Sequence, residues 1–310
     1  MNLAYRLLIA APRHKCRILL LGDVGQLPSV GAGNVLNDII DSGVVPVTKL
    51  DVIFRQAQES FIVRNSKNVY EGVKEIVFDK DFLYTEEYDT NAISDLVCTE
   101  YIRQTNQHGI DEVVVLSPVR KNGTLAVNAL NKKIQAIINP AMPGINEHNF
   151  HGTTFRERDK VMNLKNRIVE TVNGRTVDLC NGDTGTIKEI KNTSDGYACV
   201  IDFSYGRTVS LNSDDMLEVM LAYACTIHKS QGSEWRSVIL PLSSVFPASM
   251  LSRNLIYTGI TRAKKQVNII GDKRVLVKAI DNIITTRRNT ALPYKIKKYL
   301  CSERGLNNER

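Results

Sequence analysis

EVVVLSP, residues 112–118, contains four consecutive apolar residues between a charged residue and a proline. An unbroken apolar run is typical of a strand covered on both faces of a parallel sheet, whereas a strand with one wet face alternates apolar and polar residues. The same pattern occurs in CRILLLG at 16–22, in SVILPL at 237–242 and in VNIIG at 267–271. The sequence therefore predicts a parallel sheet that contains these four strands.

Helical patterns lie between the apolar runs. Residues 57–71 place Phe61, Ile62 and Val69 on one side of a predicted helix. Residues 124–138 form a second pattern, with Leu130, Ile134, Ile137 and Ile138 at helical spacing. Strands that alternate with helices predict an α/β fold.

Residues 156–221 have a different pattern, in which short β-rich runs are separated by turn dipeptides such as Asn173-Gly174 and Tyr205-Gly206. Such spacing is typical of a small antiparallel barrel. Because the α/β pattern resumes at 222–242, we expect the barrel to be inserted into an α/β domain.

Charge is unevenly distributed along the 310 residues, whose formal net charge is +7. Residues 261–310 contain 13 Lys and Arg but only 4 Asp and Glu, a net charge of +9. This basic end predicts a polyanionic partner, with nucleic acid the first candidate, although a solvated basic tail has the same composition. The predicted barrel has 9 basic and 11 acidic residues, so it is not an obvious electrostatic clamp for DNA.

Composition also excludes several classes of protein. No run of 18 apolar residues occurs, so the sequence predicts no membrane span. Six cysteines are scattered without a C-x-x-C pair, which indicates reduced thiols in a cytoplasmic protein. His148 and His151 form an H-x-x-H pattern without a completing ligand cluster, so we interpret them as loop histidines and predict no metal site.

Four motifs follow one another along the chain. They are GDVGQLPSVGAGNVL at 22–36, LDVIFRQ at 50–56, YACTIHKSQGSEW at 223–235 and IYTGITRAKKQV at 256–267. Together they resemble the later helicase motifs of superfamily 1, in the RecD-like branch that includes the exodeoxyribonuclease V alpha subunit. Any one of them is a weak signal, but four in this order are specific.

The resemblance covers roughly residues 1–280 and extends to the segment SPVRKNGTLAVNALNKKIQ, residues 117–135, and to the inserted barrel. It implies a RecA-like parallel-sheet motor domain interrupted by a small SH3-like antiparallel β-barrel, with a remnant of the first motor domain. The domains that it implies are the remnant at 1–53, the second motor domain at 54–155 and 222–285, the barrel at 156–221 and a basic tail at 286–310.

The resemblance also implies residues that act on ATP, whose hydrolysis requires a positioned water and cationic groups around the γ-phosphate. The amide of Gln26, beyond a predicted strand end, suits a water and a phosphate oxygen. Arg55 and Arg262 are implied to be arginine fingers, because a guanidinium stays charged and can bond phosphate oxygens in pairs. Taken singly, Gln26 could be an ordinary loop residue, and each arginine could form a surface ion pair. Further nucleotide contacts are implied for Asp23, Gly232 and Glu234.

Contacts to single-stranded DNA are implied for polar and basic residues that follow two predicted strands. The small polar and basic groups of the HKSQG loop suit contacts with the DNA backbone, which carry no sequence information. A tight polar turn is the alternative interpretation of this loop. The implied DNA-binding residues are Pro118, Arg120, Thr226, His228, Lys229, Ser230 and Gln231.

Two elements of an ATPase are missing from the sequence. It contains no Gly-Lys dipeptide and therefore no G-x-x-x-x-G-K-[ST] phosphate loop. Its one Asp-Glu pair, Asp111-Glu112, precedes an apolar strand, whereas a magnesium-binding pair should follow one. The resemblance implies that the chain begins just after the magnesium motif. We therefore expect ATP with magnesium to be the cofactor of the complete enzyme, and neither to bind tightly to this chain alone.

The function predicted from the resemblance is the C-terminal portion of an ATP-dependent 5′-to-3′ DNA helicase of DNA repair or recombination, inactive alone. Its expected partners are single-stranded DNA and the N-terminal half of the motor or other recombination and repair subunits. The alternative is a non-enzymatic module that binds nucleic acid or docks a partner, in which neither Arg55 nor Arg262 need face a nucleotide. An exonuclease is disfavoured, because no cluster of Asp, Glu and Lys with nuclease character occurs.

Overall fold

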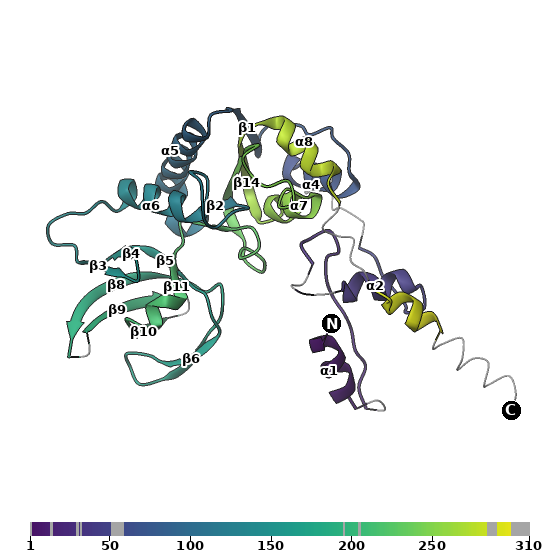
Figure 1. The fold of residues 1–310 in the computed structure, drawn as a ribbon, viewed down its shortest axis with the longest axis horizontal. Helices are drawn as coiled ribbons and strands as arrows, with labels where there is room; N and C mark the ends of the chain where they lie inside the picture. Colours follow the sequence, from purple (N-terminus) through teal and green to yellow (C-terminus); the bar gives the residue numbers. More distant parts are fainter. Residues whose placement is uncertain are drawn as a thin grey trace, which may run out of the picture.

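The computed structural model describes residues 2–12, 15–28, 31, 33–50, 59–194, 196–203, 206–283 and 290–298. A parallel five-stranded sheet in the order β1-β14-β13-β2-β12 forms the centre of one lobe (Figure 1). Its strands are β1 (Phe82–Glu86), β2 (Val113–Ser117), β12 (Ala224–Thr226), β13 (Trp235–Leu242) and β14 (Ala263–Gly271). The predicted strands at 112–118, 237–242 and 267–271 are confirmed, and with them the α/β fold.

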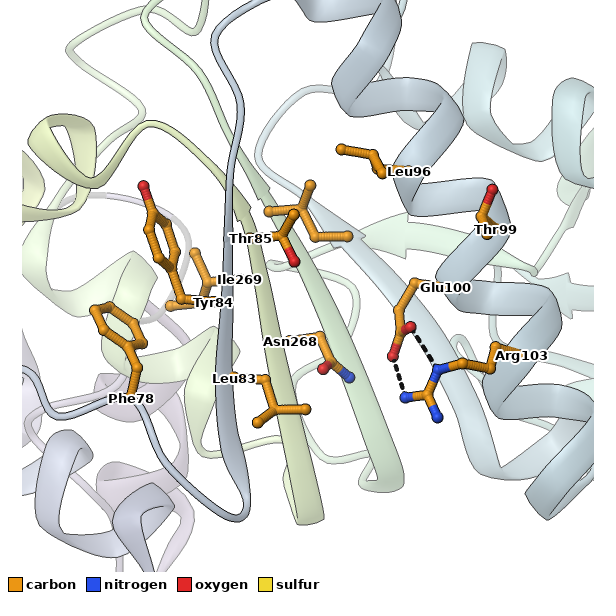
Figure 2. Close-up of a pocket in the computed structure, with 11 residues that line it drawn as sticks. Phe78, Leu83, Tyr84, Thr85, Leu96, Thr99, Glu100, Arg103, Asn268 and Ile269 are labelled. Carbon is orange, nitrogen blue, oxygen red and sulfur yellow. Dashed lines mark hydrogen bonds and ion pairs between the residues drawn. The ribbon is translucent and has the colours of Figure 1, made fainter.

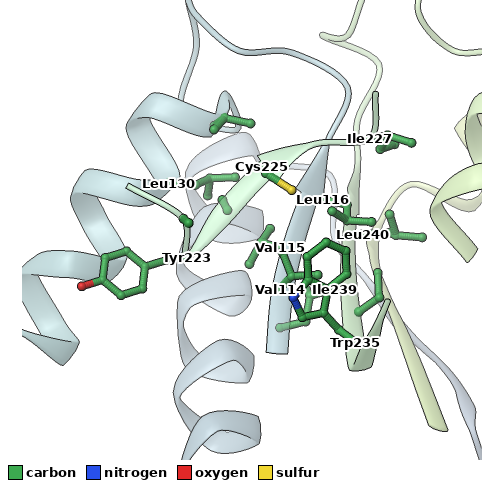
Figure 3. Close-up of a cluster of buried hydrophobic side chains, with 14 of the residues drawn as sticks. Val114, Val115, Leu116, Leu130, Tyr223, Cys225, Ile227, Trp235, Ile239 and Leu240 are labelled. Carbon is green, nitrogen blue, oxygen red and sulfur yellow. The ribbon is translucent and has the colours of Figure 1, made fainter. Parts of the chain in front are cut away.

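The core of this lobe lies on the central strands. All five residues of β2 are buried, as an unbroken apolar run predicts for a strand covered on both faces. Figure 3 shows Val115 and Leu116 of β2 beside Ile239 and Leu240 of β13, with Leu130 of α6 beside Cys225 of β12. Burial of this apolar surface is the main force that holds the sheet and its helices together.

Helices cover both faces of the sheet (Figure 1). On one side lie α5 (Thr90–His108) and α6 (Val127–Ile138). On the other lie α4 (Phe61–Glu71), α7 (Arg253–Ile260) and α8 (Lys273–Asp281). The predicted helices correspond to α4 and α6, which begin a few residues later than the patterns indicated; residues 57–58 lie outside the described part.

The strand predicted at 16–22 is wrong. This segment is irregular, and the side chains of Leu19 and Leu21 are 81% and 85% exposed. A strand forms only where a neighbour supplies hydrogen bonds, and no described segment pairs with these residues. The helices α1 (Asn2–Ala10) and α2 (Val35–Ser42) flank it, away from the sheet (Figure 1).

The second lobe is an antiparallel β-domain between α6 and β12. Its main sheet has the order β10-β9-β8-β5-β11. The strands are β5 (Lys160–Asn163), β8 (Thr184–Thr193), β9 (Gly196–Phe203), β10 (Arg207–Asn212) and β11 (Val219–Leu221). The chain leaves the parallel sheet after α6 and returns in β12, so the predicted insertion of a small antiparallel domain is confirmed.

Two hairpins and a short helix complete the β-domain. The hairpins pair β3 (Glu147–Phe150) with β4 (Thr153–Arg156), and β6 (Arg167–Glu170) with β7 (Thr176–Leu179). A 3₁₀ turn, η2 (Asp215–Glu218), leads into β11. His148, in β3, stacks on Tyr197 with ring centroids 3.8 Å apart, which joins the first hairpin to the main sheet.

Buried side-chain amides on α6 and at its C-cap hold both crossings between the lobes. Asn131, Gln135 and Asn139 are four residues apart and so lie on one face of the helix. The amide of Asn131 donates to the carbonyls of Leu221 and Ala224 at 2.8 and 3.0 Å, and its oxygen accepts from the Ala224 N–H at 2.7 Å. This residue therefore fixes the chain where it returns to the parallel sheet.

The other two amides fix the chain where it enters the β-domain. Gln135 and Asn139 donate to the two carboxylate oxygens of Asp159 at 2.5 and 2.7 Å. The hydroxyl of Tyr223 and the N–H of Arg156 also donate to Asp159, both at 2.7 Å. Asp159 is fully buried, and burial raises the pKa of its carboxyl although four donors surround it.

The next residue in the sequence, Lys160, is a buried lysine. The ammonium of Lys160 donates to the carbonyls of Ile110 and Val113 at 2.7 and 3.4 Å, and it lies 4.0 Å from the carboxylate of Asp111. Ile110 belongs to the 3₁₀ turn η1 (Ile110–Glu112), directly before β2. Burial lowers the pKa of Lys160 from 10.5 to about 8. Lys160 therefore ties β5 to the start of β2.

We expect Lys160→Met to remove a pH dependence of stability. The lowered pKa makes the folded state release its proton before the unfolded state, so stability rises with pH between about 8 and 10.5. At about 1.4 kcal/mol per pKa unit, the free energy of unfolding of the wild type should rise by about 3 kcal/mol relative to that of the variant between pH of about 8 and 10.5. Urea unfolding at several pH values measures it. Lys188→Met, at an exposed position, is the control, and parallel curves for Lys160→Met and the wild type would contradict the prediction.

Gly271, at the end of β14, has no room for a side chain. Its φ is +137°, and a Cβ would lie 1.8 Å from the carbonyl oxygen of Leu242. Gly271→Ala should therefore lower the free energy of unfolding by about 3 kcal/mol or more, through strain and steric overlap. Gly109→Ala is the control, because Gly109 also has a positive φ but no neighbour near its Cβ position. Equal losses in urea unfolding of the two variants would show that the overlap is relieved at little cost.

Candidate nucleotide and DNA site

The turn that carries Gln26 is closed by the carboxylate of Asp23. One carboxylate oxygen accepts from the N–H of Gly25 at 2.8 Å, and the other accepts from the side-chain amide of Gln26 at 3.1 Å. The N–H of Gln26 also bonds the carbonyl of Asp23 at 3.3 Å. Local bonds of this kind stabilise a tight turn and set the direction of the Gln26 side chain.

Helix α7 holds this turn along its length. The side-chain amide of Asn254 donates to the carbonyls of Val24, Gly25 and Gln26 at 3.3, 2.8 and 3.1 Å. One helical turn later, the hydroxyl of Thr258 accepts from the N–H of Leu27 at 2.9 Å. The turn and the helix are more than 200 residues apart in sequence, so these contacts join two distant motifs.

Two tyrosines pack against the same turn. The hydroxyl of Tyr257 donates to Asp23 at 3.0 Å, and burial raises the pKa of Tyr257. A Cβ on Gly25 would lie 2.5 Å from the ring of Tyr70 and 2.9 Å from that of Tyr257. Glycine is therefore the residue that lets the turn approach both rings.

Arg262 lies just beyond the end of α7 and is 6% exposed. Its guanidinium donates to the carbonyl of Thr258 at 3.2 Å, to the carbonyl of Ser233 at 3.2 Å and to the hydroxyl of Thr261 at 3.3 Å. Asn254, Thr258 and Arg262 follow one another at intervals of four residues. Thr258 thus bonds both the turn that carries Gln26 and the side chain of Arg262.

A cavity of about 320 Å³ opens beside this turn. Asp23, Gln26 and Asn254 contribute to its lining, together with Gly22 and apolar residues on both sides of the turn. Among the described residues, Asp23 is the only carboxylate that lines it, and its oxygens already accept three hydrogen bonds from other side chains and the backbone. The cavity therefore brings together amide donors but no free carboxylate for a magnesium ion.

A second cavity, of about 400 Å³, lies between α5 and the strands β1 and β14 (Figure 2). Glu100 and Arg103 of α5 bond each other there at 2.7 and 2.8 Å, opposite Asn268 of β14. None of the described residues that are predicted to bind ATP or DNA lines this cavity, so it is not the predicted site.

The predicted DNA-binding residues follow strands β2 and β12, whose ends lie side by side. Thr226 pairs in register with Ser117, and Pro118 and Ile227 follow at the same edge of the sheet. Pro118 is buried, whereas Arg120 and His228 are exposed. The carboxyl ends of parallel strands are where ligands collect in α/β sheets.

The HKSQG loop is held from three directions. The hydroxyl of Ser230, fully buried, donates to the carbonyl of Ile227 at 2.8 Å. The amide of Gln231 donates to the carbonyl of Leu27 at 2.8 Å, and the ammonium of Lys229 donates to the side chain of Asn181, in the β-domain, at 2.8 Å. Ser230 and Gln231 therefore use these groups to shape the loop, while His228 and Lys229 lie nearer its surface.

The remaining predicted residues are less closely gathered. Gly232 has a φ of +85° and ends the loop, and Glu234 is exposed, with a weak ion pair to Lys264 at 3.9 Å. Arg55 lies outside the described residues.

The histidine pattern is predicted to form no metal site. His151 bonds the carbonyl of Ser213 at 2.8 Å. In the described part of the chain, no group of three or more His, Cys, Asp or Glu is placed to hold a metal ion.

From the sequence, no role was assigned to Asn254, Tyr257, Thr258 or Asn181, although Tyr257 and Thr258 lie within the fourth motif. Asn254 and Thr258 had a detectable signal, since polar residues at intervals of four interrupt an apolar helix that ends before Arg262. Asn181 had none, because its contact with Lys229 depends on how the β-domain sits on the sheet.

Three family models match parts of the chain. The UvrD-like helicase C-terminal domain matches residues 221–270, and the SH3 domain of ATP-dependent RecD-like DNA helicases matches residues 130–203. An AAA domain model matches residues 2–84. The first model covers both the HKSQG loop and α7, and the second overlaps the inserted β-domain.

Curated relatives match most of the chain. An ATP-dependent RecD2 DNA helicase from Deinococcus radiodurans is 32% identical over 258 residues, which are 83% of this chain and 33% of that protein. A RecBCD enzyme subunit RecD from Mycolicibacterium smegmatis is 26% identical, over 88% of this chain and 48% of that protein. The chain thus spans a third to a half of the length of these two relatives.

Among solved structures, a Pif1 helicase from Bacteroides in complex with ADP-AlF3 and single-stranded DNA aligns with 91% of this chain and 66% of its own. The identity is 16% and the TM-score is 0.48. No helix in the described residues has the length and apolarity that a membrane crossing requires.

Proposed function

This chain is a member of the RecD-like family of DNA helicases, and we propose that it supplies the glutamine sensor, the arginine fingers and the single-stranded-DNA contacts of an ATP-dependent 5′-to-3′ helicase. The observation that carries the proposal is the bonding of the Gln26 turn along α7, which leads to Arg262. The polarity rests on the family resemblance. In this proposal the chain does not hydrolyse ATP alone.

The side chains beside the 320 Å³ cavity suit the phosphate end of a nucleotide. The Gln26 amide can donate to a phosphate oxygen and accept from an attacking water, and Asp23 sets its direction. Arg262, once released from the carbonyls that it now bonds, can stabilise negative charge on the transferred phosphate. Arg55 takes the same role in the proposal, and Gly232 and Glu234 lie towards the rest of the nucleotide.

ATP with magnesium remains the proposed cofactor of the complete enzyme, but the described residues do not fit a magnesium ion. Within the described part of the chain, Asp23 is the one carboxylate at the cavity, and its oxygens are engaged by Gly25, Gln26 and Tyr257. Asp111 and Glu112 form η1, before β2 instead of at its carboxyl end. We therefore assign the metal ligands and the phosphate loop to a partner domain.

Single-stranded DNA is the proposed ligand of the edge where β2 and β12 end. Arg120, His228 and Lys229 present donors there, and Thr226, Ser230 and Gln231 shape the loop. Because Lys229 also bonds Asn181, a strand that contacts Lys229 passes close to the β-domain. Contacts of this kind act on the DNA backbone and are independent of sequence.

The domain limits predicted from the sequence are part of this proposal, with residues 1–53 completing a first motor domain. The rest of the first motor domain, or another repair or recombination subunit, is the proposed partner.

The proposed location is the cytoplasm. Five cysteines in the described residues are free, in keeping with a protein that keeps its thiols reduced.

One observation favours a different function. The guanidinium of Arg262 is buried and bonds two backbone carbonyls, as a purely structural arginine would. In that case the chain would be a non-enzymatic module that binds DNA or a partner protein, and Arg262 would affect only stability.

We expect Arg262→Ala to separate these two functions. In a helicase polypeptide that carries this chain together with a phosphate loop, the variant should lower DNA-stimulated kcat by about a thousandfold, because an arginine finger acts mainly on the transition state. The KM for ATP should change only a few-fold. Arg236→Ala, at an exposed position of β13, is the control. Loss of ATP binding without a separate turnover defect, or loss of folding in urea titrations, would favour the structural role.

Lys229→Ala should weaken the binding of single-stranded DNA by this chain. Loss of one phosphate contact should also reduce the slope of log K against log salt concentration by about 0.7. Fluorescence anisotropy of a labelled oligonucleotide at four salt concentrations measures both quantities. Lys67→Ala is the control, because Lys67 lies on α4 and pairs with Glu71. An unchanged salt slope would mean that Lys229 serves only to hold Asn181.

A further inference from the structure

The side-chain amide of Asn254 meets three successive carbonyls of one turn. The residue is 7% exposed, and its two N–H groups are shared among the oxygens of Val24, Gly25 and Gln26 at 2.8–3.3 Å. No apolar side chain, and no carboxylate, could replace it without leaving these carbonyls unpaired or repelling them.

We propose that Asn254 is a positioning residue for Gln26, which holds the sensor turn against α7, the helix that leads to Arg262. The inference rests on the proposed function, in which Gln26 and Arg262 act on the same phosphate. A turn held only by Asp23 could keep its local shape and still be misplaced relative to Arg262. The bonds from Asn254 and Thr258 remove that freedom.

The arrangement on α7 gives the proposal its geometry. Thr258 donates to the carbonyl of Asn254 at 2.7 Å while it accepts from Leu27 at 2.9 Å, and its own carbonyl accepts from Arg262. A shift of the turn along the helix would break bonds at Asn254 and Thr258 together. The turn is thus held at a defined position on the helix that leads to Arg262, which is the placement that Gln26 needs in the proposed reaction.

Asn254→Asp is the sharpest test, because it keeps the size of the side chain and replaces its N–H donors with an oxygen. Asn282→Asp is a matched control. Asn282 also donates to two carbonyls, of Ala248 and Leu251 at 2.9 and 2.6 Å, but it does not contact the sensor turn. Asn254→Ala, which removes the donors without adding repulsion, provides a second variant with a milder effect on folding.

Hydrogen exchange of the 310-residue chain measures the attachment directly. We expect the amides of Gly25, Gln26 and Leu27 to exchange at least about tenfold faster in both Asn254 variants, with exchange in β13 and β14 unchanged. Asn282→Asp should leave the turn at its wild-type rate. If the turn exchanges equally fast in wild type and variants, or if β13 and β14 also lose protection, Asn254 does not act specifically on the turn.

DNA-stimulated ATP hydrolysis, in a helicase polypeptide that carries this chain together with a phosphate loop, measures the effect on Gln26. Asn254→Asp should lower kcat about tenfold or more and change the KM for ATP less than about twofold, because misplacement of Gln26 affects the transition state. Asn282→Asp should retain wild-type kcat. A kcat of Asn254→Asp within twofold of wild type would overturn the positioning role. Absence of turnover in the wild type would instead overturn the proposed function, while hydrogen exchange would still decide whether Asn254 holds the turn.

Discussion

The two crossings of the chain between the lobes set the architecture, and both depend on buried amides on α6 and at its C-cap. When a domain is inserted into a parallel sheet, the segment that leaves the sheet and the segment that returns to it lie side by side. The backbone groups of these segments are buried from water and need hydrogen-bond partners within the protein. Asn131 bonds the returning segment, and Gln135 and Asn139 bond the departing one through Asp159. Because each amide both fills space and satisfies buried polar groups, the two lobes are joined by bonds with defined directions.

The contacts of α7 also fix a distant segment of the chain, and they use the same spacing of four residues. A stripe at intervals of four residues presents Asn254, Thr258 and Arg262 to one side, and apolar residues of the helix face the sheet. In both helices a buried amide bonds the carbonyls of a distant segment that forms no sheet with it. Side-chain hydrogen bonds thus hold these segments in place, as backbone hydrogen bonds between strands do elsewhere in the fold. On α7 they fix the turn whose Gln26 side chain acts in the proposed function.

The sequence predicts the parallel sheet well because its strands are covered on both faces, so their apolar runs are unbroken. The sequence also predicts the inserted β-domain, because turn residues at short intervals separate its β-rich runs. The site is predicted only in part: Gln26 and Arg262 are found through motifs, whereas Asn254 and Asn181 depend on contacts between segments 48 to 230 residues apart. The strand prediction at 16–22 is wrong for a different reason. Its apolar run has the pattern of a strand, but the residues of one segment do not show whether a neighbouring strand is present to pair with it.

That failure bears on how the chain works. Leu19, Leu21 and Leu50 are among the most exposed apolar side chains of the described residues, and they lie in segments on either side of α2. A buried-strand sequence on the surface is stable only when another sheet edge receives it, since its backbone groups and its side chains both need cover. In the proposed helicase, that edge would belong to the first motor domain, which would also hold the phosphate loop. The turn that carries Gln26 directly follows this segment, so the strand pairing that covers Leu19 and Leu21 would bring the phosphate loop to the cavity that Gln26 lines.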